Sequence, residues 1–340
     1  MGNRMGKHTL NFGKRIEIAG FAAVTGKKEG EGRLKFDRSA PDGLFGEKTW
    51  EKAESAMQRE ALDRAIEKSG LPEQDVRTVC AGDLTGQCIA SAFGIRGRSM
   101  EYLGLYGACS TMAEGLILAA SMVEAGFADT TAAVTSSHFC SAERQYRYPL
   151  EYGGQRTPTS QWTVTGSGAV ILRESGTDGE PMRPLHITRA AIGEITDYGI
   201  ADVNNMGAAM APAAYRTIRG MLEDTKTAPA DYDLIVTGDL GNVGGAIFAD
   251  MFAEDGVRLP NYDDCGKMIF DGARQDTHAG GSGCGCSASV LCGHLLNEMQ
   301  RGKWKRIIFA ATGALMSPVS AGQGESIPGV CHAVVIERGE

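Results

Sequence analysis

Two stretches of nearly the same sequence, VCAGDL at residues 79–84 and IVTGDL at residues 235–240, decide the fold. Each is a short apolar run that ends in Gly-Asp-Leu, and each follows a helix-like stretch, a proline and acidic residues. Apolar runs of this length between turn signals are typical of buried strands. The recurrence predicts that the chain contains two copies of one βαβ-type unit.

A second pair of matching segments follows along each copy. A helix rich in small residues is expected from Gly107 to Ala125, and a similar one from Gly283 to Gln300 begins 176 residues later (283 − 107). Because strands and helices alternate, we expect an α/β fold with mostly parallel sheets and buried central helices. The expected halves are residues 1–175 and 184–340, joined by a linker at 174–183 that is rich in Gly, Pro, Asp and Ser.

The composition is that of a folded protein with many tight turns. Of the 340 residues, 42% are hydrophobic and 22% are charged, which allows a full core. The 46 glycines are about twice the usual share of ~7%. A net charge of −8 argues against a nucleic-acid partner, because such partners require basic surfaces.

The cysteines and the apolar segments bear on the compartment. Nine cysteines cannot all pair, so free thiols in a reducing compartment are expected. The start of the chain, Met1–Lys14, is polar and basic, and the longest apolar stretch, Leu116–Val123, is shorter than the ~20 residues of a membrane-spanning helix. We therefore expect a protein that has no signal peptide and no transmembrane segment.

One cysteine stands where chemistry is expected. Cys109 lies in the segment Tyr106–Thr111, where Gly107 and Ala108 permit a sharp turn from a strand into a helix. The partial positive charge of a helix N-terminus favours a thiolate. This position suits a nucleophile and an anion-binding site equally well, and the alternative is a small buried residue at a helix start.

The duplicated halves, with a cysteine at the start of the first central helix, resemble the thiolase superfamily, which includes ketoacyl-ACP synthase III. Within it, longer stretches resemble the stage V sporulation protein AD family (SpoVAD) of spore-forming bacteria. The resemblance covers nearly the whole chain. The stretches that carry it are residues 81–84, 105–111, 136–138, 162–168, 210–214, 279–284 and 325–328.

The chain departs from the enzymes of that superfamily. Condensing enzymes need, beside the cysteine, a histidine and a second histidine or asparagine from the second half. Here the corresponding segments read GDLGNV at 238–243 and GSGCG at 281–285, and a carboxylate at Asp239 near a thiol would raise its pKa. The resemblance therefore implies a pseudo-enzyme. His138 or His278 could substitute for the missing partners, so a divergent ketoacyl-synthase-type acyltransferase that uses Cys109 is the alternative, and a scaffold without small-molecule affinity is a third hypothesis.

The resemblance implies a ligand, dipicolinic acid, and a role in its uptake into the developing spore. This ligand is flat, aromatic and doubly anionic, so it requires arginines or backbone N–H groups for its carboxylates and an apolar slot for its ring. The segment at 143–148 offers arginines and tyrosines, or it is a solvated loop. The expected ligand-binding residues are Asp83, Cys109, Ser110, His138, Arg144, Asn242 and Cys284.

Metal is expected only as calcium on the ligand. Asp83 and Asp239 follow matching strands and could contribute oxygen ligands to this calcium, or each could simply cap a turn. We assign Asp83 to ligand binding and Asp239 to the structural role. The spacing of Cys284, Cys286, Cys292 and His294 matches no common zinc site, and no resident cofactor is expected.

The resemblance also implies partners and a location. The expected partners are the membrane-embedded SpoVA proteins, and the expected place is the spore or forespore, peripheral on its inner membrane. By fold analogy a homodimer that pairs through the sheet edges is the default expectation, with a monomer as its alternative.

Overall fold

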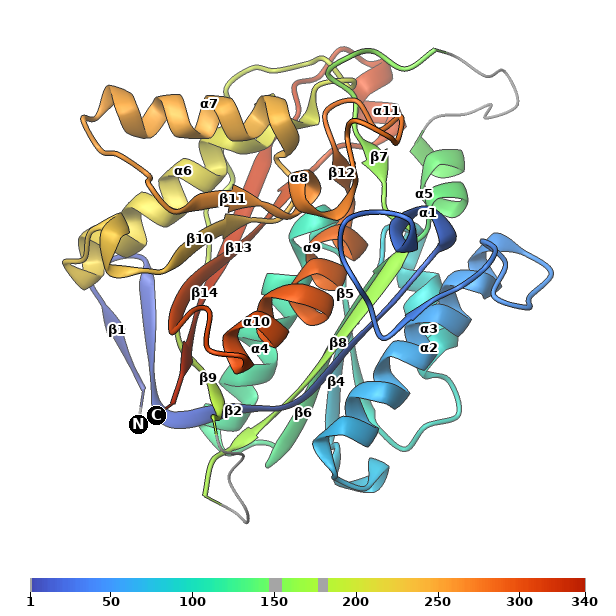
Figure 1. Cartoon of the computed structure of the whole chain (residues 1–340), viewed down its shortest axis with the longest axis vertical. Coiled ribbons are helices and arrows are strands. Elements are labelled where there is room, and N and C mark those ends of the chain that lie inside the picture. The colour runs from blue at the N-terminus through green and yellow to red at the C-terminus, as the bar shows by residue number, and fades with distance from the viewer. Residues whose placement is uncertain (1, 147–154, 177–182, 340) are drawn as a thin grey trace.

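A computed structural model describes residues 2–146, 155–176 and 183–339 (Figure 1). Its centre is a long mixed sheet to which both halves contribute. The first half supplies, in spatial order, β2 (Thr9–Thr25), β8 (Gly166–Glu174), β6 (Thr130–Ser137), β4 (Thr78–Gly82) and β5 (Glu101–Leu105). The second half supplies β9 (Leu185–Ala191), β14 (Gly329–Arg338), β13 (Arg306–Ala314), β10 (Leu234–Thr237) and β11 (Tyr262–Asp264).

The strand order shows the duplication. β2 pairs with β9 antiparallel at the junction, and from there the order in one half repeats the order in the other. The parallel pairs that the alternation of strands and helices predicts lie in the outer part of each half, where β4 pairs with β5 and β6 and β10 pairs with β11 and β13. The pairs from β13 through β14, β9, β2 and β8 to β6 are antiparallel.

The helices form three layers around the two halves of the sheet. α2 (Trp50–Ser69) and α3 (Ile89–Ile95) cover one outer face, and α6 (Met206–Thr225) and α7 (Gly241–Glu254) cover the other. Between the halves lie α4 (Thr111–Ala125) and α9 (Cys284–Val290), the latter continuing through a π-helical turn (Leu291–Leu295) into α10 (Leu296–Gln300). The predicted fold class, two α/β halves with buried central helices, is confirmed.

Short elements connect these layers. Two short strands, β1 (Asn3–Met5) and β3 (Arg38–Ser39), each pair with β2. Two others, β7 (Trp162–Thr163) and β12 (Gly281–Ser282), form a separate parallel pair. The short helices are α1 (Lys27–Gly30), α5 (Phe139–Tyr146), α8 (Cys265–Ile269) and α11 (Pro318–Gly322). The expected linker at 174–183 lies largely outside the described residues.

Small residues allow the central helices to lie close to the strands. A Cβ at Gly285 of α9 would lie 2.3 Å from the Gly166 carbonyl oxygen and 2.7 Å from the Ser137 backbone nitrogen. α4 ends at Gly126, whose φ of 72° is left-handed and therefore favours glycine. Gly285 is thus required for packing, and Gly126 for the conformation that ends its helix.

One helix among the described residues, Ala108–Ala125, is long and apolar enough by composition to cross a membrane. It contains the central helix α4, and 61% of it is buried inside the protein. Its apolar side chains, among them Met112 and Leu116, pack in the core between the two halves of the sheet. Its hydrophobicity is therefore explained by core packing.

Candidate functional site

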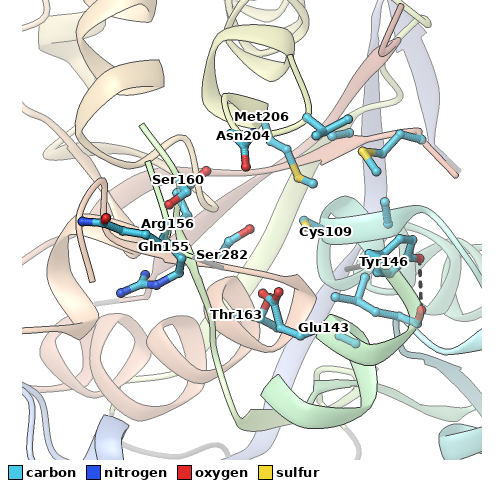
Figure 2. Close-up of a pocket in the computed structure, with 17 residues that line it drawn as sticks. Cys109, Glu143, Tyr146, Gln155, Arg156, Ser160, Thr163, Asn204, Met206 and Ser282 are labelled. Carbon is cyan, nitrogen blue, oxygen red and sulfur yellow. Dashed lines mark hydrogen bonds between the residues drawn. The ribbon is translucent and has the colours of Figure 1, made fainter. Parts of the chain in front are cut away.

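A cavity of about 230 Å³ opens beside Cys109, at the carboxyl ends of strands from both halves (Figure 2). Apolar, polar and charged side chains line it. They are Leu84, Ala108, Cys109, Ala142, Glu143, Tyr146, Gln155, Arg156, Ser160, Gln161, Thr163, Val203, Asn204, Met206, Ser282, Ala314 and Met316. Brändén's rule places the ligands of open α/β folds outside the carboxyl ends of strands, which is where this cavity lies.

Cys109 is held in the cavity wall by a sharp turn. Ala108 has a φ of 51°, a left-handed conformation that is uncommon outside glycine. A 3-10 turn, Ala108–Ser110, then leads directly into α4. Cys109 is 6% exposed, so its thiol contacts the cavity while most of the side chain is buried.

Asp239 lies behind Cys109, where β10 ends. Its carboxylate accepts hydrogen bonds from Ser282 Oγ at 3.2 Å, the Gly283 backbone nitrogen at 2.9 Å and Thr312 Oγ1 at 2.9 Å. The Cys109 thiol lies beside the same carboxylate, close enough for the two groups to affect each other's pKa. Burial nevertheless raises the pKa of Asp239 to about 6, so the group is mostly ionised at neutral pH.

The pKa of the Cys109 thiol is raised well above its usual value. Burial is the largest cause, followed by the interaction with the negatively charged Asp239 carboxylate. The helix start that suggested a thiolate is thus outweighed by desolvation and by a neighbouring negative charge, both of which disfavour a second anion. In its ground state the group is a thiol.

The wall opposite Asp239 comes from α5 and is largely aromatic and apolar. The Tyr146 hydroxyl lies 2.6 Å from the Tyr106 hydroxyl and donates to the Leu84 carbonyl oxygen at 3.1 Å. Burial raises the pKa of Tyr146 strongly, so it stays neutral. Glu143, one turn earlier, accepts a hydrogen bond from Thr163 Oγ1 at 2.9 Å.

Gln161 joins the entrance of the cavity to its base. Its amide nitrogen donates to the carbonyl oxygens of Asp239 at 2.7 Å and Gly281 at 2.8 Å. The neighbouring strands β7 and β12 pair in parallel, which fixes Trp162 and Thr163 against the glycine-rich turn before α9. The entrance and the base of the cavity are therefore one connected structure.

Three of the predicted site residues lie together. Cys109 lines the cavity, whereas Ser110 and Cys284 are buried behind its wall. Ser110 Oγ donates to the Gly107 carbonyl oxygen at 2.7 Å, and the Cys284 thiol donates to the Ser136 carbonyl oxygen at 3.0 Å. Cys284 is close enough to Cys109 for each charge to affect the other, but it does not line the cavity.

Asp83 and His138 lie outside the cavity lining. The carboxylate of Asp83 accepts hydrogen bonds from Thr85 and Ser91, from the backbone nitrogen and the hydroxyl of each, so it caps its own turn. His138 Nδ1 accepts from the Cys140 backbone nitrogen at 3.1 Å, so Nε2 carries the proton and donates to the Gly43 carbonyl oxygen at 2.6 Å. Burial lowers the pKa of His138, which is neutral and structural here.

Arg144 and Asn242 also lie outside the lining. Arg144 forms an ion pair with Glu51 at the surface. Asn242 is exposed, and its side-chain nitrogen donates to the His278 carbonyl oxygen at 3.4 Å. Residues 147 and 148 of the segment at 143–148, which offers arginines and tyrosines for the ligand, lie outside the described residues.

The expected ligand-binding residues do not include Glu143, Tyr146, Arg156, Gln161 or Thr163, all of which line the cavity, although the segment at 143–148 offers tyrosines for the ligand. A signal existed for two of them. Glu143 and Tyr146 are three residues apart on α5 and thus share a face of the helix, whereas Arg144 points away from it. Arg156 and Gln161 come from an irregular segment that carries no motif, whereas Thr163 lies on β7, within the stretch 162–168 that carries the resemblance.

The structure gives no sign of a metal centre. Among residues 2–146, 155–176 and 183–339, no group of three or more His, Cys, Asp or Glu side chains is arranged to hold a metal ion. Cys286 and Cys292 are buried, whereas His294 packs edge-on against Trp304. The one carboxylate in the cavity lining is that of Glu143.

Two α/β halves with a cysteine at the start of a buried central helix define a thiolase-like protein. The fold is shared with 3-oxoacyl-[acyl-carrier-protein] synthase III from Aquifex aeolicus VF5, at a TM-score of 0.55 and 13% identity over 95% of this chain and 99% of that one. A variant of OleA from Xanthomonas campestris shares the fold at a TM-score of 0.61 and 13% identity, over 95% of this chain and 98% of that one. An OleA variant with cerulenin shares it at a TM-score of 0.60 and 14% identity, over 96% of this chain and 97% of that one. At such identities the likeness shows the fold alone.

The sequence places the chain more narrowly. The family model of stage V sporulation protein AD (SpoVAD) matches residues 6–337. Stage V sporulation protein AD of Bacillus subtilis (strain 168) is 41% identical over 336 residues, which cover 98% of this chain and 97% of that protein. The chain belongs to the stage V sporulation protein AD family, as its motifs predicted.

Proposed function

We propose that this chain binds dipicolinic acid in the cavity beside Cys109 and serves its uptake into the developing spore without catalysing a reaction. The observation that carries the proposal is the position of the Asp239 carboxylate beside the Cys109 thiol. An acyl-transfer nucleophile needs a base or cation that favours the thiolate, and Asp239 acts in the opposite direction. No histidine stands among the described residues that line the cavity.

The cavity lining supports a flat aromatic ligand. Tyr146, Leu84 and Ala142 form one apolar wall, and Met206 and Met316 add polarizable side chains. Donors for carboxylates are arranged around this slot, namely Gln155, Arg156, Ser160 and Asn204. An apolar slot with a few polar groups is the usual form of a small-molecule site.

Calcium, if it takes part, would arrive on the ligand. Ca²⁺ requires roughly six to eight oxygen ligands, and Glu143 offers the one carboxylate among the described residues that line the cavity. Two carboxylates of the ligand would supply further oxygens. In this arrangement Glu143 binds the chelate as one ligand among several, so calcium should strengthen binding through Glu143.

Calorimetric titration of dipicolinate, with and without calcium, tests the proposal. Val203 lines the entrance and is 38% exposed, so Val203→Trp should block the cavity without disturbing the core. We expect saturable binding to the wild type, about tenfold or weaker binding to Val203→Trp, and unchanged binding to Val319→Trp, an exposed control outside the lining. A folded wild type that gives no saturable heat would refute dipicolinate binding.

Acyl transfer by Cys109 is the second candidate. It is favoured by the turn at Ala108, which presents Cys109 to the cavity, and by a fold shared with a 3-oxoacyl-[acyl-carrier-protein] synthase. Incubation with acyl-CoA followed by intact-mass measurement would detect an acylated enzyme. Turnover that disappears in Cys109→Ala would establish this activity in place of the first proposal.

A dimer follows from the exposed sheet edge. β5 is an edge strand on which Tyr102 and Leu103 are 39% and 42% exposed, and Ile89 and Phe93 lie exposed on the adjacent α3. Unpaired apolar edges favour pairing with another chain. We propose that two copies pair through β5, and that membrane-embedded SpoVA proteins hold the assembly at the inner membrane of the forespore.

A further inference from the structure

Two cations meet on one aromatic ring at the entrance of the cavity. Lys28 Nζ lies 3.6 Å and Arg156 Cζ lies 4.8 Å from the ring centroid of Trp162. Phe139 stacks on Trp162 at 4.0 Å with an interplanar angle of 13°. Because a ring and an ammonium group cannot occupy the same space over one centroid, Phe139 and Lys28 lie on opposite faces of Trp162.

The positive charge of this pair is only partly balanced. Arg156 Nη2 donates to the Asp276 carbonyl oxygen at 2.8 Å and lies 3.1 Å from its carboxylate, and Lys28 Nζ lies 3.4 Å from the same carbonyl oxygen. The Asp276 side chain is 76% exposed, so water screens its charge, and it also pairs with His278 Nε2 at 2.9 Å. Burial, followed by repulsion from Arg156, lowers the pKa of Lys28, and the charges of Asp276, Glu29 and Glu31 act against this.

Arg156 has hydrogen-bonding capacity that the described residues do not use. Its side chain is 11% exposed, and Nη1 is buried without a hydrogen-bond partner. A guanidinium normally places such nitrogens on carboxylates or carbonyls, because an unpaired buried donor costs free energy. The residue lines the same cavity as Cys109, and in Figure 2 it lies on the side of the cavity opposite Tyr146.

We propose that Arg156, supported by Lys28 on Trp162, is the subsite for a second carboxylate of the ligand and makes the cavity select dianions over monoanions. The inference rests on the proposed binding of dipicolinate. A small reorientation of the guanidinium would bring Nη1 onto the carboxylate while Nη2 stays on Asp276. The aromatic wall at Tyr146 would then hold the ring, and the cation pair would determine the charge that the site accepts.

The test compares dipicolinate with picolinate, which has the same ring and one carboxylate. We expect the wild type to bind dipicolinate about 10- to 100-fold more tightly than picolinate, the range of a hydrogen bond to a charged group. In Arg156→Gln the ratio of the two dissociation constants should fall to about one to three, mainly because dipicolinate binding weakens. Lys28→Gln should lower the ratio partly.

Two further variants make the result decisive. Arg144→Gln removes the same charge from a surface arginine that pairs with Glu51 outside the cavity lining, and its ratio should equal that of the wild type. Arg156→Lys keeps the charge without the fork and should give an intermediate ratio, which carries the test if Arg156→Gln fails to fold.

An unchanged ratio in the Arg156 and Lys28 variants would overturn the subsite while leaving dipicolinate binding intact. A wild type that binds neither compound would overturn both.

Discussion

The Cys109 thiol lies beside the Asp239 carboxylate, although 130 residues separate them in the chain (239 − 109). One begins the central helix of the first half, and the other ends a strand of the second half. The contact therefore exists only because the two halves pack face to face. It places a carboxylate, whose negative charge disfavours a thiolate, beside the position where a nucleophile would stand.

Replacing the Asp239 carboxylate should increase the reactivity of the Cys109 thiol. In Asp239→Asn the negative charge is lost, so the pKa of Cys109 should fall toward its ordinary value and the thiolate fraction should rise about tenfold for each pKa unit. The rate of Cys109 alkylation by iodoacetamide at pH 8, located by peptide mass spectrometry, measures this. Asp263→Asn, a change at a half-exposed carboxylate of β11, should leave the rate unchanged. Equal rates in both variants would show that Asp239 does not control the thiol.

The close contact of α9 with the strands should not tolerate a methyl group. In Gly285→Ala the new Cβ would lie 2.3 Å from the Gly166 carbonyl oxygen and 2.7 Å from the Ser137 nitrogen, both of them backbone atoms that cannot turn aside. We expect a loss of roughly 2–4 kcal/mol in the free energy of unfolding. Urea titration measures the loss, and Gly272→Ala is the control because a Cβ there meets nothing within 4 Å. Similar midpoints for the two variants would contradict this packing.

The duplication was predictable because buried strands and small-residue helices leave strong patterns. The expected helix from Gly107 to Ala125 and the expected end at Gly126 agree with the structure, since a left-handed C-cap requires glycine. The roles of the two matching aspartates, Asp83 and Asp239, could not be predicted in this way. Asp83 was assigned to function and Asp239 to structure, yet it is Asp239 that contacts Cys109.

A difference in the two motifs explains the reversal. Asp83 is followed two and eight residues later by Thr85 and Ser91, whose hydroxyls donate to it. The corresponding positions of the second copy, 156 residues later, are Gly241 and Ile247, which have no hydroxyl to offer. Asp239 therefore takes its donors from other segments, namely from Ser282, Gly283 and Thr312. The cavity wall on α5 and the cation pair at Trp162 depend on long-range packing, which no local pattern records.

A charge on the edge strand should prevent pairing of two copies. Leu103→Asp places a carboxylate in the middle of β5, where a second strand would bury it at a cost of several kcal/mol. Light scattering after size exclusion should give twice the chain mass for the wild type and the single mass for the variant. Phe127→Asp changes an equally apolar and more exposed residue away from the edge, and should stay dimeric. A monomeric wild type would refute the dimer, and a dimeric Leu103→Asp would place its interface elsewhere.

The buried carboxyl of Glu54 should make stability fall as pH rises. It accepts hydrogen bonds from Ser136 Oγ at 3.1 Å and Ser141 Oγ at 2.6 Å, and its pKa is raised from 4.5 to about 8 by burial and then by the charge of Asp83. Since the folded state holds this proton more tightly than the unfolded chain, its contribution is full below pH 4.5 and is lost as pH rises through about 8.

Glu54→Gln removes this titration and keeps a hydrogen-bonding side chain of the same shape. The variant should lose less free energy of unfolding between pH 5 and pH 9 than the wild type does, by about 1.4 kcal/mol for each unit of the pKa shift. Urea titrations at pH 5, 7 and 9 give the comparison. Some pH dependence should remain, because burial also raises the pKa of Glu29 and of Asp264 to about 7. Glu67→Gln, an exposed change on the same helix, should run parallel to the wild type. If the Glu54 variant also runs parallel, the carboxyl is ionised at no cost, and the hydrogen bonds from Ser136 and Ser141 must stabilise its charge.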